Sequence, residues 1–139
     1  MKVLMWREVL MKWSHVLALY LFWPAVAVVV WGELTPQPPN LEAAVWDKLL
    51  HFTAYFGLAG LATVALNARR PALWAVLGLA ILGGALEIVQ GMTGRDPDIY
   101  DELANLLGAL TGGAVGWLMM TALRWGMPQV GPKIDAAID

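Results

Sequence analysis

The amino-acid sequence predicts an all-α, polytopic membrane protein built as a bundle of four transmembrane helices. Three observations support this prediction. Hydrophobic residues make up 59% of the 139-residue chain and charged residues only 14%, whereas soluble proteins carry roughly 25% charged residues. The apolar residues fall into four runs of about 20 residues, the length needed to cross a bilayer. Most of the charged residues lie at the ends of these runs.

The composition also excludes several classes of protein. The chain has no cysteine, which removes disulfides, thiol nucleophiles and zinc–thiolate sites. Its net charge of −2 leaves no basic patch, so nucleic acid is not expected as a partner. A chain of 139 residues is long enough for one domain.

The first expected span covers residues 13–31 and follows a basic head at residues 1–12. Trp13 and Trp31 bracket this run, as aromatic residues do at the two interfaces of a membrane. The segment 25–27 (Ala-Val-Ala) has the form of a signal-peptide cleavage site. Because the apolar run continues beyond it to Trp31, the sequence favours a helix that is retained.

The other spans are separated by short connections. Residues 33–40 are rich in proline and are expected to form an extended loop, followed by a short interfacial turn at residues 41–46. Pro71 is placed to begin the third helix. The remaining expected elements are spans at residues 46–66, 71–91 and 100–123, and a tail at residues 124–139.

The distribution of basic residues predicts the orientation in the membrane. The head holds three Lys or Arg residues, the turn at residues 67–71 holds two and the tail two, whereas the segment 33–46 holds none. The positive-inside rule then places both termini in the cytoplasm. Eight of the eleven Asp and Glu residues fall on the opposite face or just beneath it. We therefore expect an acidic, extracytoplasmic site.

Polar side chains from three spans are expected to meet in one layer near this outer face. Within each span they recur every three or four residues, so that each set shares one face of its helix. The members are Asp47, His51 and Tyr55 in the second span, Glu87 and Gln90 in the third, and Asp101 and Asn105 in the fourth.

Three members of this layer are candidates for catalysis, namely His51, Glu87 and Asp101. The imidazole of His51 suits proton transfer near neutral pH, and an ionisable group within a span, such as Glu87, suggests a functional site. The alternative for Glu87 is an ion pair with His51, Lys48 or Arg95 that only locks the helices together. These residues are compatible both with an enzyme and with a protein that only binds its ligand.

The other polar residues of the layer and its loop are assigned to ligand binding. The guanidinium group of Arg95 suits an anionic headgroup, or it pairs with the acids beside it in the loop. No established metal-ligand spacing is present, so we assign no metal ligands, and the sequence does not specify a cofactor. The expected ligand-binding residues are Asp47, Lys48, Tyr55, Gln90, Arg95, Asp98 and Asn105.

A strip of glycines follows the polar residues of the fourth span. Gly108, Gly112 and Gly116 recur every four residues, which lets a neighbouring helix approach closely. Packing within the chain is the simplest interpretation. The strip also offers a surface for a homo-oligomer.

The polar residues of the last three spans and their loop, in the order in which they occur, resemble those of the VanZ-like family of small bacterial membrane proteins. The resemblance covers about half of the chain, and it implies a protein of the bacterial cytoplasmic (inner) membrane and cell envelope. Through the family's namesake it also implies a link to antibiotic resistance, namely resistance to teicoplanin. The motifs that carry it are Asp47-Lys48-xx-His51-Phe52-xx-Tyr55, Glu87-xx-Gln90 and Arg95-xx-Asp98-xx-Asp101-xxx-Asn105-xx-Gly108.

These observations are compatible with four alternative functions. The first is an outward-facing polar pocket that binds, and in one version modifies, a lipid-linked envelope component or a lipoglycopeptide. The second is a membrane-embedded hydrolase or transferase that uses His51 and Glu87. The third is a proton-coupled transporter with Glu87 as the carrier, and the fourth is a structural subunit of an envelope complex.

Overall fold

The computed structural model describes residues 2–35, 41–92 and 98–125, and these form four α-helices. Each helix contains a segment long and apolar enough to cross a membrane. The prediction of an all-α chain with four candidate membrane spans is therefore confirmed. The helices are α1 (Lys2–Leu34), α2 (Leu41–Leu66), α3 (Arg69–Met92) and α4 (Ile99–Arg124).

Several helix boundaries differ from the sequence-based prediction. Helix α1 runs without a break from Lys2, so the expected basic head is its first part. It also continues past Trp31 and includes Glu33, which we expected in a loop. Helix α2 begins at Leu41, where an interfacial turn was expected. Helix α3 begins two residues before Pro71, which is accommodated because the first amides of a helix need no acceptor within it.

A tight connection joins α2 to α3. Asn67 has a φ angle of 48°, in the left-handed region that asparagine tolerates better than most residues. The guanidinium group of Arg124 donates to both the main-chain and the side-chain oxygen of Asn67. The end of α4 is thereby fastened to the turn between α2 and α3.

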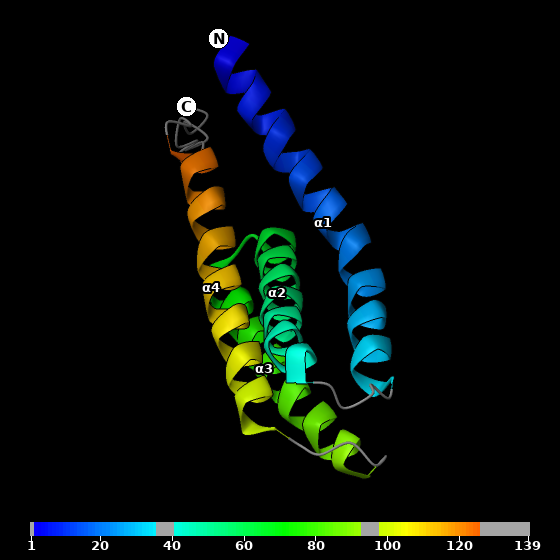
Figure 1. Cartoon of the computed structure of the whole chain (residues 1–139). Helices are drawn as coiled ribbons and strands as arrows, with labels where there is room; N and C mark the ends of the chain where they lie inside the picture. Colours follow the sequence, from blue (N-terminus) through cyan, green and yellow to red (C-terminus); the bar gives the residue numbers. More distant parts are fainter. Residues whose placement is uncertain (1, 36–40, 93–97, 126–139) are drawn as a thin grey trace, which may run out of the picture.

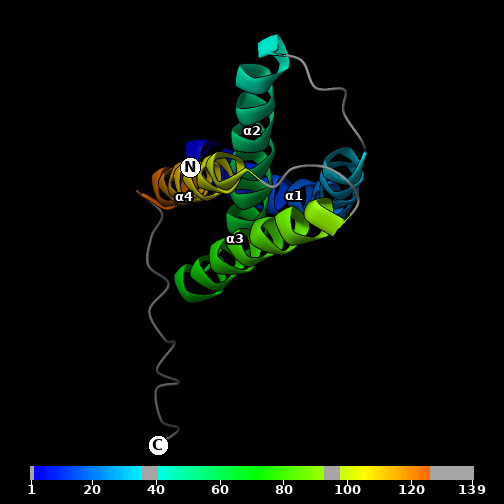
Figure 2. The same cartoon turned by 60° about the horizontal axis from the view of Figure 1, so that its bottom comes forward.

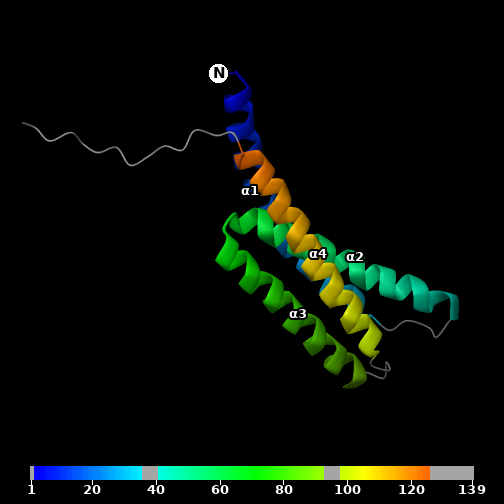
Figure 3. The same ribbon diagram turned by 90° about the vertical axis from the view of Figure 1, so that its left-hand side faces the viewer.

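Helix α2 occupies the centre of the molecule and packs against the other three helices, most extensively against α4 (Figure 1). The start of α1 and the end of α4 lie at one end, and α2 and α4 begin at the other (Figure 1). Seen from this second end, the helices splay in different directions rather than running parallel (Figure 2). A side view shows α2 inclined to both α3 and α4 (Figure 3).

The glycine strip of α4 lies directly against α2. A methyl group at Gly108 or Gly112 would collide with the main-chain carbonyl of Phe52 or Phe56, and one at Gly116 would lie 3.0 Å from the carbonyl oxygen of Gly60. The two backbones are therefore close enough that no side chain fits between them. Within the chain this face is occupied by α2, in agreement with the simplest interpretation of the strip, and a homo-oligomer stays a prediction.

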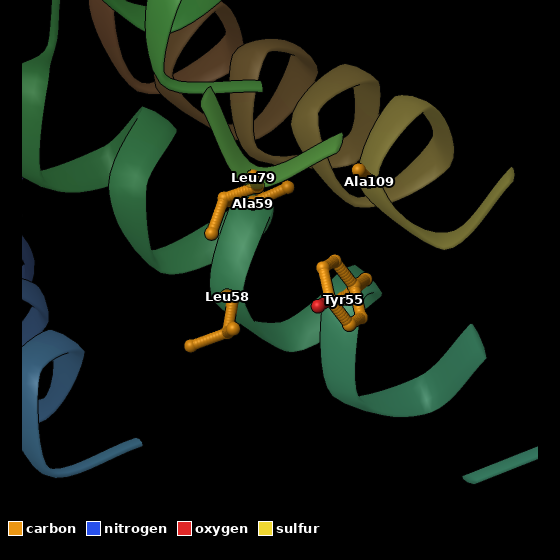
Figure 4. Close-up of a cluster of buried hydrophobic side chains, with 5 residues drawn as sticks. All are labelled: Tyr55, Leu58, Ala59, Leu79 and Ala109. Atoms are coloured by element: carbon orange, nitrogen blue, oxygen red, sulfur yellow. The ribbon is translucent and has the colours of Figure 1, made fainter. Parts of the chain in front are cut away.

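A small apolar core lies where α2, α3 and α4 meet. It contains Tyr55, Leu58 and Ala59 of α2, Leu79 of α3 and Ala109 of α4 (Figure 4). The alanines on α2 and α4 are fully buried, and their small size suits the close approach of these two helices. This core lies immediately beside the polar end of the bundle, because Tyr55 follows His51 by one helical turn.

Helix α1 contributes least to the interior. Of its most apolar 18-residue stretch 6% is buried, against 44% in α2. The remainder of its surface is covered with large apolar and aromatic side chains. A membrane accommodates such a surface, whereas water does not. The aromatic side chains exposed on α1 are Trp6, Trp13, Tyr20, Trp23 and Trp31.

Candidate polar site at one end of the bundle

Polar side chains gather at the end of the bundle where α1 and α3 finish and where α2 and α4 begin. All four helices contribute to this polar site, whereas the sequence predicted contributions from three. Burying so many polar groups is costly unless they are paired or bind something. The buried members are Glu33, His51, Glu87, Gln90, Asp101 and Asn105.

His51 lies at the centre of a chain of hydrogen bonds. Its Nδ1 atom is 3.0 Å from Oδ1 of Asn105, and the amide nitrogen of Asn105 donates to Oε2 of Glu102 at 3.4 Å. Oε1 of Glu33 lies 3.5 Å from the same Nδ1 atom. Because carboxylate and amide oxygens only accept, Nδ1 carries the proton. In a neutral ring the lone pair therefore belongs to Nε2.

The Nε2 side of His51 faces a further carboxylate. Oδ1 of Asp47, one helical turn earlier, lies 3.9 Å from Nε2. Asp47, His51 and Asp101 each place one potential ligand atom within 4.8 Å of the others. The first two come from α2 and the third from α4, so the crossing of these helices forms this group. Among the residues expected to act in catalysis, His51 and Asp101 are thus brought together.

Lys48 joins α2 to the start of α4. Its ammonium group donates to Oδ2 of Asp98 at 2.5 Å and to Oδ1 of Asp101 at 2.9 Å. Asp98 also caps α4, since its Oδ1 accepts the main-chain amide of Tyr100 at 2.9 Å. The hydrogen bond from Lys48, followed by that from the Tyr100 amide, lowers the pKa of Asp98 below its usual value. Lys48 itself stays about one-third exposed.

The polar residues of α3 contact both neighbouring segments. Oε2 of Glu87 accepts the main-chain amide of Asp98 at 3.2 Å. The side-chain amide of Gln90 donates to the main-chain oxygen of Glu33 at 2.7 Å. Gln90, which we expected to bind a ligand, therefore holds the last turn of α1. Glu87 likewise holds the start of α4, through its hydrogen bond from the main-chain amide of Asp98.

Three residues of the site were missed by the sequence analysis. Glu33 was placed in a loop, although it is the first acid after the apolar run of α1. Glu102 precedes Asn105 by three residues, a helical spacing that could have identified it. A side chain at Gly83 would meet Oε2 of Glu102 at 2.6 Å, the amide nitrogen of Asn105 at 2.9 Å and the Tyr55 hydroxyl at 3.2 Å. Because Gly83 has no side chain, these three groups have room to approach one another.

Two cavities open on either side of the polar site. The first, of about 210 Å³, lies between α1 and α2, and the second, of about 310 Å³, lies between α3 and α4. Both combine acidic and apolar walls. The first is lined by Val28, Val29, Gly32, Glu33, Asp47, Leu50, His51 and Ala54, and the second by Gly84, Glu87, Asp98, Ile99 and Glu102.

The described part of the site is strongly acidic. Six carboxyl groups face the ammonium group of Lys48 and the imidazole of His51. Such a site attracts cations and hydrogen-bond donors more readily than anions. Arg95, the cation expected to receive an anionic headgroup, lies outside the described residues. The six acids are Glu33, Asp47, Glu87, Asp98, Asp101 and Glu102.

Comparison with known proteins identifies no relative, since no protein family, no curated protein and no solved structure matches the chain. The resemblance to the VanZ-like family therefore stays a prediction. The fold and the site together define a class, a protein with four helices long and apolar enough to span a membrane and an acidic polar site at one end.

Proposed function

We propose that the protein binds the polar head of an amphiphile that enters the site sideways from the membrane. The amphiphile is a lipid-linked envelope component or a lipoglycopeptide in the outer leaflet of the bacterial cytoplasmic membrane. The observation that carries this proposal is the cavity between α1 and α2. Its walls are apolar on one side and acidic on the other.

The position of this cavity supports sideways entry. Val28 on α1 and Leu50 on α2 line it, and both side chains are largely exposed on the surface that faces lipid. Asp47 and His51 line its polar side. An acyl or polyprenyl chain would remain among apolar side chains while its head reached the carboxylates.

The polar wall of this cavity restricts which head groups of an amphiphile can bind. A hydroxyl, amide or ammonium group can donate to Asp47 and to the lone pair on Nε2 of His51. An anionic head would instead need a cation at the site, and Lys48 is already engaged by Asp98 and Asp101. Sugar and peptide groups of envelope precursors and lipoglycopeptides fit the first description.

The proposed outward orientation rests on the distribution of basic residues. The positive-inside rule would place the polar site toward the extracytoplasmic side, where such amphiphiles are presented. Described residues that carry the VanZ-like resemblance, among them Asp47, His51 and Asp101, also belong to the site.

Binding is better supported than catalysis by a pair formed from His51 and Glu87. His51 lines the cavity between α1 and α2, whereas Glu87 lines the cavity between α3 and α4. An acid and a base that act on one bond must reach the same reacting atoms. The carboxylates that form a group of potential ligand atoms with His51 belong to Asp47 and Asp101.

The test is to identify the lipids that the protein retains after mild detergent extraction from bacterial membranes, by native mass spectrometry with fragmentation. We expect one amphiphile per chain in the wild type and its loss in Val29→Trp, which fills the cavity between α1 and α2. Val9→Trp makes the same change far along α1 and should retain the amphiphile. Equal retention by both variants would exclude this cavity as the binding site.

A further inference from the structure

We propose that Asp47, His51 and Asp101 bind a divalent transition-metal ion, at a site that the sequence did not indicate. The three ligand atoms lie within 4.8 Å of one another. Metal–ligand bonds of about 2.0–2.2 Å would bring them to roughly 3.5 Å apart. The required contraction is about 1 Å, which rotation of the carboxylate side chains can supply.

The protonation of His51 points to a cation on its Nε2 side. The proton on Nδ1 is directed to Asn105, and Oε1 of Glu33 lies 3.5 Å away on the same side. The lone pair of Nε2 therefore lies on the side of Asp47, whose Oδ1 is 3.9 Å away, and Asp101 belongs to the same group of potential ligands. A cation held by these three residues would interact favourably with each of them.

The surroundings of His51 are those of a metal ligand. Histidines that bind metals usually donate their other ring N–H to a carbonyl or carboxylate oxygen, which fixes the orientation of the ring. Asn105 serves as this acceptor, and Glu102 in turn holds the amide of Asn105. His51 and Asn105 are both buried, with exposed fractions of 5% and 0%. The nitrogen that would bind the metal is thus held in place by two further residues.

The charge balance favours a divalent ion. The six carboxylates of the site and Lys48 carry a net charge of −5 when the acids are ionised and the imidazole is neutral. Lys48 already neutralises part of the charge of Asp98 and Asp101. A divalent ion would reduce the remaining excess to −3.

The ligand types narrow the choice of metal. One imidazole and two carboxylates suit Zn²⁺ or Mn²⁺, whereas Mg²⁺ and Ca²⁺ prefer oxygen ligands alone. Three protein ligands leave a further coordination position for an exogenous oxygen. Asp47 and His51 line the cavity between α1 and α2, so that position is accessible from it. With the metal bound, an oxygen of the proposed amphiphile's head would occupy this position in place of a hydrogen bond to Nε2 of His51.

The experiment uses the full chain in detergent, stripped of metal with a chelator and then titrated with Co²⁺. We expect one Co²⁺ per chain with visible absorption bands, displaced by Zn²⁺ but not by Mg²⁺ at the same concentration. Asp47→Asn and His51→Ala should each weaken Co²⁺ binding at least tenfold. Glu8→Gln removes a carboxylate near the start of α1 and should leave the affinity unchanged.

Several results would overturn the proposal. The absence of saturable Co²⁺ binding would do so, as would equal displacement by Mg²⁺, which indicates a diffuse acidic surface. An unchanged affinity in Asp47→Asn would exclude the assigned ligands, even if His51→Ala failed to fold. Because no amphiphile is added, this test does not depend on the proposed lipid ligand.

Discussion

The helix pair formed by α2 and α4 has two halves that differ sharply. In one half, Gly112 and Gly116 let the backbones touch, with no side chain between them. In the other, Lys48 and His51 reach across to acids and an amide of α4. The glycine half is sufficient to set the spacing of the helices, because close packing drives helix association in lipid. The polar half adds further contacts between the helices, but it also buries more acids than Lys48 and His51 can neutralise, and these acids call for another explanation.

The largest expected effect is that of Gly112→Ala in the glycine half. Its methyl group would collide with the backbone carbonyl of Phe56, which cannot move without separating the helices. We expect a loss of about 3 kcal/mol, measured as a lower melting temperature in detergent. Gly57→Ala is the control, because nothing lies within 4 Å of its added methyl group. Similar melting temperatures for the two variants would contradict the proposed role of the glycine half.

The next effect in size is expected for Lys48→Met in the polar half. Asp101 would lose its ammonium partner while its side chain stays 7% exposed. We expect a destabilisation of about 2 kcal/mol, because the remaining acid is buried and Lys48 is itself partly solvated. Lys12→Met, on the exposed surface of α1, provides the matched control. Equal melting temperatures for these two variants would show that Lys48 does not hold the start of α4.

Gly83→Ala tests whether a glycine in the polar half is more tolerant than Gly112. The added methyl group would meet the ends of the Glu102, Asn105 and Tyr55 side chains rather than a backbone. Because the ends of side chains can shift more easily than a backbone, we expect a cost of about 1 kcal/mol. The comparison is with Gly78→Ala on the same helix, where nothing lies within 4 Å. A loss as large as that of Gly112→Ala would mean that the polar half is packed as rigidly as the glycine half.

The smallest expected effect is that of Asp98→Asn on how the melting temperature depends on pH. The pKa of Asp98 is lowered by Lys48 and the Tyr100 amide, so its stabilising effect is complete above the unfolded-state pKa of about 4. It is lost as the pH falls through the lower pKa of the folded state. The melting temperature of Asp98→Asn should therefore fall less between pH 5 and pH 3 than that of the wild type. We expect only a small difference between the two proteins, because the Asp98 carboxylate is 37% exposed. An identical pH dependence of the two melting temperatures would contradict the stabilising role of Asp98.

The helices were predictable because the length and polarity of each run are local properties of the sequence. The same is true of the faces shared by Asp47 with His51 and by Asp101 with Asn105. Glu33 was missed because its place in the site depends on contacts with His51 and Gln90, far along the chain. The pairing of Lys48 with the start of α4 likewise depends on how two helices cross, which a helical repeat does not specify.

The most direct test of the division between the two halves is His51→Gln, examined for both retained amphiphile and melting temperature. Glutamine can still donate to Asn105, so the account predicts a melting temperature close to that of the wild type. It also predicts that the amphiphile retained by the wild type is lost. A melting temperature lowered as far as that of Gly112→Ala, with the amphiphile still bound, would show that the polar half serves to hold the helices together.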